Sequence, residues 1–346
     1  IYKFLCMKDY KIMTVSNNAY SAIYVVCPAY SKSGGPELLH QLVHVLNNNG
    51  VKAIIAYTAY NKEDKLSPVN AAFKKYVKKY CLFEQIPDRA DSIVVFPEVN
   101  IEDIHFLKNA TKYCWWLSVD NYLKRYNLHY IIKNKLTRYF LTWTKHGFWR
   151  YGFSYIRKNV SKNLVQSYYA EDYLKKRGFT NIVYLSDYIN EEYQEDTSIS
   201  YRNNAVLYNP KKGIEFTRQL IEAAPDLNWV PLENMSNEEV RGKLKTSKVY
   251  IDFGDHPGKD RFPREAAISG CCVITGKRGS AAYDDVPIPE EYQFEDSVTS
   301  IPAIVETIRE CLVDYDRRMR DFDGYRSTIK AEKNKFIEDV RSIFMH

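Results

Sequence analysis

The sequence predicts an α/β protein with two Rossmann-like domains in tandem, which face one another across a ligand cleft. Short apolar runs rich in β-branched residues alternate with helical patterns, which is typical of doubly wound parallel sheets. A polar stretch at residues 190–204 interrupts this alternation once. The length of 346 residues also favours two domains over one. We therefore expect one domain at 1–190, a second at 191–325, and a C-terminal helix at 326–346 that returns to the first.

In the first half of the chain, buried strands precede helices with recognisable ends. A strand is expected at 22–27 (AIYVVC), because a short β-branched apolar run indicates a strand buried on both faces. The helix that follows begins near Pro36, which suits a first helical turn. The other elements expected in this half are strands at 51–59, 92–96, 113–119, 164–167 and 182–185 and a helix at 170–177.

The second half repeats the alternation. Ser236 and Glu239 form a capping-box signature that opens one helix. The other expected elements are strands at 205–208, 229–232, 249–253 and 271–275 and helices at 213–224 and 262–269. Two amphipathic helices follow, around 304–315 and 336–344. We expect these last helices to pack back onto the domains.

The composition is that of a globular protein. Apolar residues make up 45% of the chain and charged residues 27%, which excludes a disordered or fibrous protein. No apolar run approaches the roughly 18 residues that span a bilayer, and no signal peptide opens the chain. The seven cysteines form no CxxC pair, so reduced thiols are expected instead of disulfides or zinc ligands. We expect a cytoplasmic protein, and a first residue of Ile1 is consistent with one module of a longer chain with other domains.

Positive charge gathers in one segment. Residues 121–170 contain ten Lys or Arg and thirteen aromatic residues, with no Asp or Glu. Interleaved cations and aromatic rings suit an anionic membrane surface, at which the protein would be peripheral. They also suit nucleic acid, although we do not expect a nucleic-acid partner. The alternative is a basic helical face whose aromatic rings are buried.

Two loops lead from predicted strands into helices and favour an anion. Gly34 and Gly35 let a phosphate or sugar approach the backbone because no Cβ stands in the way. The pair is not the GxGxxG fingerprint, which weighs against a nicotinamide dehydrogenase. Lys211 and Lys212 occupy the matching place in the second half and could neutralise a diphosphate. The structural alternatives are a tight turn and a solvated lysine pair.

The densest group of charges lies at residues 252–271, where a predicted strand ends and a helix begins. Ligands of such sheets bind outside the carboxyl ends of the strands. Glu265 is placed to accept hydrogen bonds from a ribose diol, and Arg261, Arg264 and Lys259 could hold phosphate oxygens. The alternative for Glu265 is a favourable interaction with the helix dipole, which leaves the other charges unexplained.

Together these three segments resemble the GT-B glycosyltransferases, in particular the retaining family 4 and related enzymes of bacterial polysaccharide and lipopolysaccharide synthesis. The resemblance extends from about residue 22 to residue 294 and is most specific at 262–274. It implies that the first domain binds the acceptor and that the second binds a nucleotide sugar. It also implies that Glu265 binds the ribose of the donor and that the Lys-Gly segment ending at Gly213 binds the diphosphate.

The sequence departs from this family at one position. The family usually has two glutamates separated by seven residues, and the first would fall on Pro257. Asp255, His256 and Asp260 are the candidates to replace it as sugar contacts. The retaining stereochemistry that the family implies therefore lacks one of its usual residues here.

Acidic residues that follow strands of the first domain are candidates for the reaction itself. Asp120 ends a predicted strand and is expected to point toward the other domain, as an acceptor contact or as the base of an inverting enzyme. Asp187 is a second catalytic candidate near the domain junction, and Glu98 is a weaker third. A helix-capping role is the alternative for both aspartates.

The function expected from these features is that of a hexosyltransferase, which moves a sugar from a nucleotide diphosphate to a saccharide or polyprenyl-linked acceptor. No DxD-like acidic motif stands at the end of a predicted strand, so no metal or other cofactor is expected. GT-B enzymes stabilise the leaving diphosphate with basic side chains and helix dipoles instead. Two alternatives stay open: a nucleotide-sugar epimerase of the same fold, and a non-catalytic module that binds a polyanion or glycan.

Overall fold

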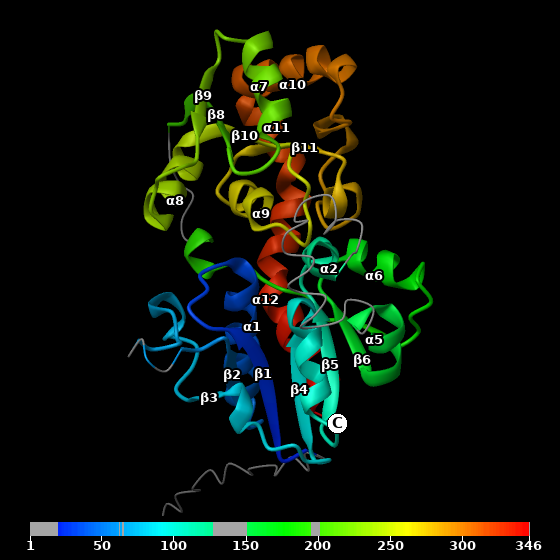
Figure 1. Ribbon diagram of the computed structural model, residues 1–346. Coiled ribbons are helices and arrows are strands. Elements are labelled where there is room, and N and C mark those ends of the chain that lie inside the picture. The colour runs from blue at the N-terminus through cyan, green and yellow to red at the C-terminus, as the bar shows by residue number, and fades with distance from the viewer. Residues whose placement is uncertain (1–19, 62, 64–65, 127–150, 195–200, 346) are drawn as a thin grey trace, which may run out of the picture.

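A computed structural model describes residues 20–61, 63, 66–126, 151–194 and 201–345. Two parallel sheets form two domains, one above the other in Figure 1. The strands of the first sheet are β1 (Ala22–Pro28), β2 (Ala53–Thr58), β3 (Tyr80–Leu82), β4 (Ser92–Pro97), β5 (Thr111–Trp116), β6 (Lys162–Val165) and β7 (Ile182–Tyr184). They lie in the order β3-β2-β1-β4-β5-β6-β7. The chain therefore winds outward in both directions from the β1–β4 pair, as a doubly wound sheet does.

Helices cover both faces of this first sheet because its strands are apolar on both sides. They are α1 (Gly34–Asn48), α2 (Val119–Tyr126), α5 (Phe153–Asn159) and α6 (Tyr168–Lys175). Along β1, Ile23 and Val25 belong to the core shared with α1, whereas Tyr24 and Val26 belong to the core on the opposite face. This alternation follows from the two-residue period of a strand. It explains why β1 is a continuous apolar run in the sequence.

The second sheet is smaller but built in the same way. Its strands are β8 (Asn203–Tyr208), β9 (Asn228–Pro231), β10 (Ser247–Asp252), β11 (Cys272–Gly276) and β12 (Gln293–Phe294), in the order β12-β11-β10-β8-β9. The helices that follow them are α7 (Ile214–Ala223), α8 (Asn237–Thr246), α9 (Arg261–Ile268), α10 (Ile301–Val313) and α11 (Tyr315–Arg318). The capping box predicted at Ser236 and Glu239 is present at the start of α8.

The last helix, α12 (Asp323–Phe344), connects the two domains and is the long red helix of Figure 1. Tyr325 and Ile329 near its start belong to the core of the second domain. Phe336, Val340 and Ile343 near its end belong to the core of the first domain, on the α1 face. The prediction that the C-terminal helices pack back is therefore confirmed. This one continuous helix has apolar side chains in both cores. A change in the angle between the two domains would therefore have to bend α12.

Two differences from the predicted elements have a physical reason. The edge strands β3 and β12 were not predicted because they are short and carry polar or half-exposed residues. The strand predicted at 113–119 ends at Trp116 instead. Its next backbone N–H, of Leu117, donates to Glu98 Oε2 over 3.0 Å, and α2 then begins at Val119. The hydrogen bonding between neighbouring strands therefore ends at Leu117, whose N–H group donates to the Glu98 side chain instead.

The remaining global expectations concern cysteines and membrane spans. In the part of the chain that the structure describes, the cysteines are free thiols, and all of them except the half-buried Cys81 are buried. Burial raises the pKa of the Cys271 thiol to about 12, which makes it unreactive at neutral pH. Among the described helices, none is both long and apolar enough to cross a bilayer.

Candidate functional site

The predicted glycine loop of the first domain meets helix α9 of the second. A Cβ built on Gly34 would lie 3.2 Å from Arg261 Nε, so the absence of a side chain lets the loop pass close to this arginine. Arg261 also forms an ion pair with Glu37, in the first turn of α1. Glu37 accepts a 3.0 Å hydrogen bond from the hydroxyl group of Tyr76. Two of the three predicted segments therefore come together, and Glu37 is a residue that the sequence analysis did not assign.

A second glycine brings the two domains into backbone contact. A Cβ on Gly258 would lie 2.2 Å from the carbonyl oxygen of Leu117, far closer than such atoms approach. The same carbonyl accepts a 2.7 Å hydrogen bond from Gln166 Nε2. On the other side, a Cβ on Gly35 would lie 3.4 Å from the Leu117 side chain. The loop before α9 therefore rests on the first domain, and a side chain at position 258 would push the domains apart.

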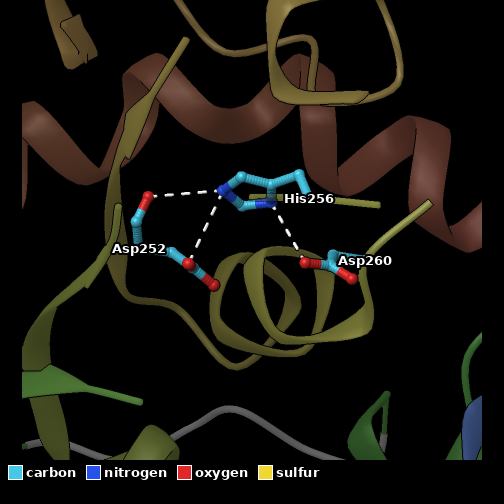
Figure 2. A group of neighbouring side chains, drawn as sticks. All are labelled: Asp252, His256 and Asp260. Carbon is cyan, nitrogen blue, oxygen red and sulfur yellow. Dashed lines mark hydrogen bonds and ion pairs between the residues drawn. The ribbon is translucent and has the colours of Figure 1, made fainter. Parts of the chain in front are cut away.

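A chain of alternating charges runs from the domain surface into the second domain. Lys212 Nζ lies 2.7 Å and 2.9 Å from the two carboxylate oxygens of Asp260. Asp260 Oδ2 lies 3.2 Å from His256 Nδ1, and His256 Nε2 lies 3.5 Å from Asp252 Oδ1. Figure 2 shows the imidazole ring between the two carboxylates. The ring is fully buried, whereas Lys212 is about one-third exposed, so the chain links the core to the surface.

Local backbone geometry fixes the inner end of this chain. Asp252, the last residue of β10, accepts a 2.8 Å hydrogen bond from the hydroxyl group of Tyr250. His256 has a positive φ of 42°, which is uncommon for a residue with a side chain and is concentrated at functional sites. A Cβ on Gly279 would lie 2.2 Å from the His256 carbonyl oxygen, and Ser280 N donates to that oxygen over 2.9 Å. The close contact and the hydrogen bond of the His256 backbone therefore fix the imidazole ring in its buried position.

The outer end of the chain is positioned by a second glycine-containing loop. Gly213 has a φ of 61°, and a Cβ there would lie 2.1 Å from the carbonyl oxygen of Phe253. A Cβ on Gly254 would lie 2.8 Å from Lys212 Cβ. These close approaches press the loop before α7 against the end of β10. As a result Lys212 reaches Asp260, while Lys211 is exposed to solvent.

The charges in this chain compensate one another. Burial by itself lowers the pKa of His256, but Asp252 and Asp260 outweigh it and raise this pKa to about 9. For Asp260, His256 and Lys212 overcome the effect of burial and lower the pKa. At neutral pH two carboxylates therefore face two cations. The three ligand atoms of Asp252, His256 and Asp260 lie within 4.8 Å of one another. A metal ion there would have to displace the proton of His256 and the ammonium group of Lys212, so the set fits a metal ion poorly.

Glu265 lies on α9 beneath Arg261. The residue is 8% exposed. Burial raises its pKa, against the opposing charges of Arg261 and Arg264 and a hydrogen bond with Tyr193. A carboxylate held in this way at the carboxyl edge of a sheet is a strong hydrogen-bond acceptor for a ligand hydroxyl group. Tyr193 comes from the segment that joins the two domains, and nothing in its local sequence indicated this contact.

Two residues predicted for the site, Arg264 and Asp187, meet in a buried cluster at the next turn of the same helix. Arg264 was predicted to hold donor phosphate, but its side chain is completely buried. Its two terminal nitrogens lie 2.8 Å and 2.7 Å from the carboxylate of Asp187, and Nη1 lies 2.9 Å from Glu332 Oε2 on α12. Lys259 completes this buried cluster, 2.9 Å from Glu332. Asp187, predicted as catalytic, is thus fully occupied, and both residues join the domains instead.

Asp120 remains the catalytic candidate of the first domain. It lies at the start of α2, half-buried, and accepts a 2.9 Å hydrogen bond from Tyr169. Burial raises its pKa, and the negative charges of Asp255 and Asp260 in the other domain raise it further. Asp120 therefore faces the second domain. Asp255, predicted as a sugar contact, is exposed and lies 3.5 Å from Arg278.

Glu98, the weaker candidate, is enclosed by the first domain. It is 2% exposed, and burial raises its pKa to about 8. Its carboxyl group accepts a hydrogen bond from the backbone of Leu117, at the end of β5. Another acid that the sequence analysis missed is Asp285, which accepts hydrogen bonds from the N–H groups of Tyr168 and Tyr169 at the start of α6. An aspartate that caps a helix from another domain has no local sequence signal.

The basic, aromatic segment at 121–170 is described only at its two ends, because residues 127–150 lie outside the described part. In its second end, the aromatic ring of Phe153 packs against Trp116 and Tyr122 in the core. Arg157 donates to the carbonyl oxygen of Arg177 over 2.7 Å. The ring of Phe153 thus has a structural role, whereas Tyr168 is exposed, and a membrane-surface role for this segment stays a prediction.

Comparison with known proteins shows which solved structures share this fold. No protein-family model matches the sequence, and no curated protein matches it. Solved structures do match. TarM aligns with a TM-score of 0.67 and 11% identity over 94% of this chain and 99% of that chain. HepE of Anabaena, in complex with UDP and glucose, aligns with a TM-score of 0.61 and 11% identity over 92% and 97%. The lipopolysaccharide outer core galactosyltransferase WaaB aligns with a TM-score of 0.56 and 13% identity over 93% and 99%.

The fold is therefore that of the GT-B glycosyltransferases, as the sequence predicted. The matches cover both domains of this chain and nearly the whole of each matched structure, so the likeness extends over the whole fold. With at most 13% identity among these three, they define the fold alone. The chemistry has to be argued from this protein's own residues.

Proposed function

We propose that this protein is a hexosyltransferase that moves a sugar from a nucleoside-diphosphate donor to a saccharide or lipid-linked glycan in cell-surface polysaccharide or lipopolysaccharide synthesis. The observation that carries the proposal is the meeting of Lys212, Arg261 and Glu265 of the second domain with the Gly34 loop of the first. Within the described residues, Arg261 Nη2 is buried without a hydrogen-bond partner. An unsatisfied guanidinium donor at such a junction favours an anionic ligand.

The donor in this proposal is a UDP-sugar. The HepE structure of the same fold contains UDP and glucose, and the WaaB structure is named for galactose transfer to lipopolysaccharide. In our chain Glu265 would accept hydrogen bonds from the ribose hydroxyl groups. Lys212, Arg261 and the N–H groups at the start of α7 would contact the diphosphate. The sugar would then lie against Gly34 and Gly35, which offer backbone without side chains.

The reaction in this proposal needs no metal ion. As the bond between the anomeric carbon and the diphosphate breaks, negative charge accumulates on the departing phosphate, next to Lys212 and Arg261. The acceptor hydroxyl oxygen forms the new bond to the anomeric carbon, and its proton passes to the departing phosphate oxygen. Attack and departure then take place on the same face of the sugar, which gives retention, in keeping with the family that the sequence resembles. In an inverting reaction, Asp120 would take the proton instead.

The experiment is a thermal-shift panel of UDP, GDP, CMP, ADP and dTDP on the wild type, Glu265→Ala and Glu222→Ala. Glu222 is exposed on α7 of the same domain and serves as the matched control. We expect UDP to stabilise the wild type and the control. Glu265→Ala should weaken UDP binding by about tenfold or more, since a charge-assisted hydrogen bond contributes about 1.5–3 kcal/mol.

The outcomes separate the possible activities. Stabilisation by UDP that is lost in Glu265→Ala supports the ribose contact. If no nucleotide stabilises the wild type, the proposed function is wrong, and a polyanion- or glycan-binding module becomes the better explanation. If UDP does stabilise the wild type, incubation with UDP-glucose and UDP-N-acetylglucosamine without acceptor tests for a 2-epimerase, which would convert the donor sugar into its C2 epimer.

A further inference from the structure

The side chain of Asp260 occupies an unexpected place. Asp260 is the N-cap residue of α9, a position at which aspartate ordinarily accepts a hydrogen bond from the helix N–H groups. It makes no such bond here. Both of its carboxylate oxygens face Lys212 Nζ instead, at 2.7 Å and 2.9 Å. Its charge is therefore used to hold the lysine that we propose for the donor diphosphate.

We propose that Asp260 is a resident anion, which holds Lys212 in the nucleotide-free protein and releases it to the diphosphate of the donor by moving onto His256. His256 is then a positioning residue that acts through Asp260. This inference rests on the proposed function, because it concerns the same diphosphate site and says which group pairs with Lys212 before the donor binds.

The surroundings of Asp260 lower the free-energy cost of releasing Lys212. When Lys212 leaves, the carboxylate still has the imidazolium group of His256, 3.2 Å away. The N–H groups of Arg261 and Phe262 at the start of α9 also have no partner within the helix, whereas Pro263 has no N–H. Without His256, a carboxylate that is only 14% exposed would lose its remaining cation. An unpaired buried charge is strongly unfavourable, so Asp260 would then retain Lys212. His256 is therefore the residue that permits the lysine to leave.

Arg261 offers the diphosphate a second cation. It follows Asp260 directly in the chain, and its Nη2 has no hydrogen-bond partner among the described residues. A diphosphate carries charge for two such contacts. It can thus accept hydrogen bonds from Lys212, once Asp260 releases it, and from the free nitrogen of Arg261 together.

The test is a double-mutant cycle of Asp260→Asn and His256→Asn, with the affinity for UDP and for inorganic pyrophosphate measured by titration calorimetry. Asparagine at position 256 tolerates the positive φ, and melting temperatures verify that each variant folds. Asp226→Asn removes the same charge from an exposed ion pair with Arg309 elsewhere in the domain and is the control. We expect Asp260→Asn to tighten binding by about three- to fivefold.

The second arm of the cycle distinguishes exchange from simple electrostatics. His256→Asn alone should weaken UDP binding by about fivefold or more, because Asp260 then holds Lys212 more firmly. In the Asp260→Asn background the same substitution should change affinity by less than about twofold. If the two effects merely add, or if Asp260→Asn weakens binding, the exchange is wrong while the UDP site stands. If pyrophosphate shows the coupling and no nucleotide binds, the exchange stands and the proposed function is wrong.

Discussion

Arg261 and Arg264 lie three residues apart on α9 and belong to two very different ion-pair clusters. Arg264 is completely buried and holds Asp187 and Glu332, so it joins the second domain to the chain just after β7 of the first domain and to α12. Arg261 is 20% exposed, pairs with Glu37 of the first domain and leaves one nitrogen without a partner. The first cluster is saturated, and the second is incomplete. The comparison shows that one helix can carry a permanent connection and an exchangeable one.

The largest effect should follow from opening the saturated cluster. Arg264→Ala leaves Lys259 to compensate both Asp187 and Glu332 in the protein interior, and breaking a buried pair in this way costs about 3–5 kcal/mol. We expect urea denaturation to show a decrease of this size in the free energy of unfolding. Arg261→Ala, at the partly exposed position, should cost only about 1 kcal/mol. Equal losses for the two arginines would show that the distinction between the clusters is wrong.

The next effect concerns the charge chain and depends on pH. The pKa of His256 is raised to about 9 in the folded protein, against about 6.5 in an unfolded chain. The folded state therefore binds the proton more tightly. Its contribution to stability is fully present below about pH 6.5 and disappears as the pH rises through about 9, with a total of about 3 kcal/mol.

The measurement is the free energy of unfolding of the wild type minus that of His256→Asn, from pH 6 to pH 10. Taking the difference removes the titration of groups that both proteins share. The groups that face the imidazole are Asp252, Asp260, Lys212 and Asp296, and none of them is altered in this comparison. The difference should fall steadily between pH 6.5 and pH 9. A difference that does not vary with pH would mean that the buried imidazole is neutral, and the resident-anion exchange would lose its basis.

The contrast between the two arginines also marks what the sequence could predict. Apolar periodicity and helix-capping residues predicted both sheets and most of the helices, because these signals lie within short stretches of the sequence. The segments around Gly34, Lys212 and Glu265 were found because strand ends of a parallel sheet meet at one edge. The partners of Arg264 are 77 and 68 residues away in the chain. Whether an arginine on α9 faces α12 or the other domain depends on packing that no local pattern contains.

The smallest effect should follow from removing the interdomain pair of Arg261. Glu37→Gln keeps the size of the side chain and a hydrogen-bond acceptor for Tyr76, but it releases the guanidinium group. A partly exposed ion pair contributes about 0–1 kcal/mol, so UDP affinity should rise by no more than about fivefold. Stability should hardly change. Titration calorimetry with UDP, with Tyr76→Phe as the matched control, measures this effect.

The direction of that small effect decides what Glu37 does. The Tyr76→Phe control removes the 3.0 Å hydrogen bond to Glu37 and a 3.5 Å hydrogen bond from Gln41. It leaves the charge of Glu37 beside Arg261, so UDP affinity should stay close to that of the wild type. Tighter binding in Glu37→Gln means that Glu37 competes with the diphosphate for Arg261, as Asp260 does for Lys212. Weaker binding would mean instead that Glu37 orients Arg261 toward the donor. In that case the first domain supplies part of the donor site, and the cluster at Arg261 is exchangeable on one side only.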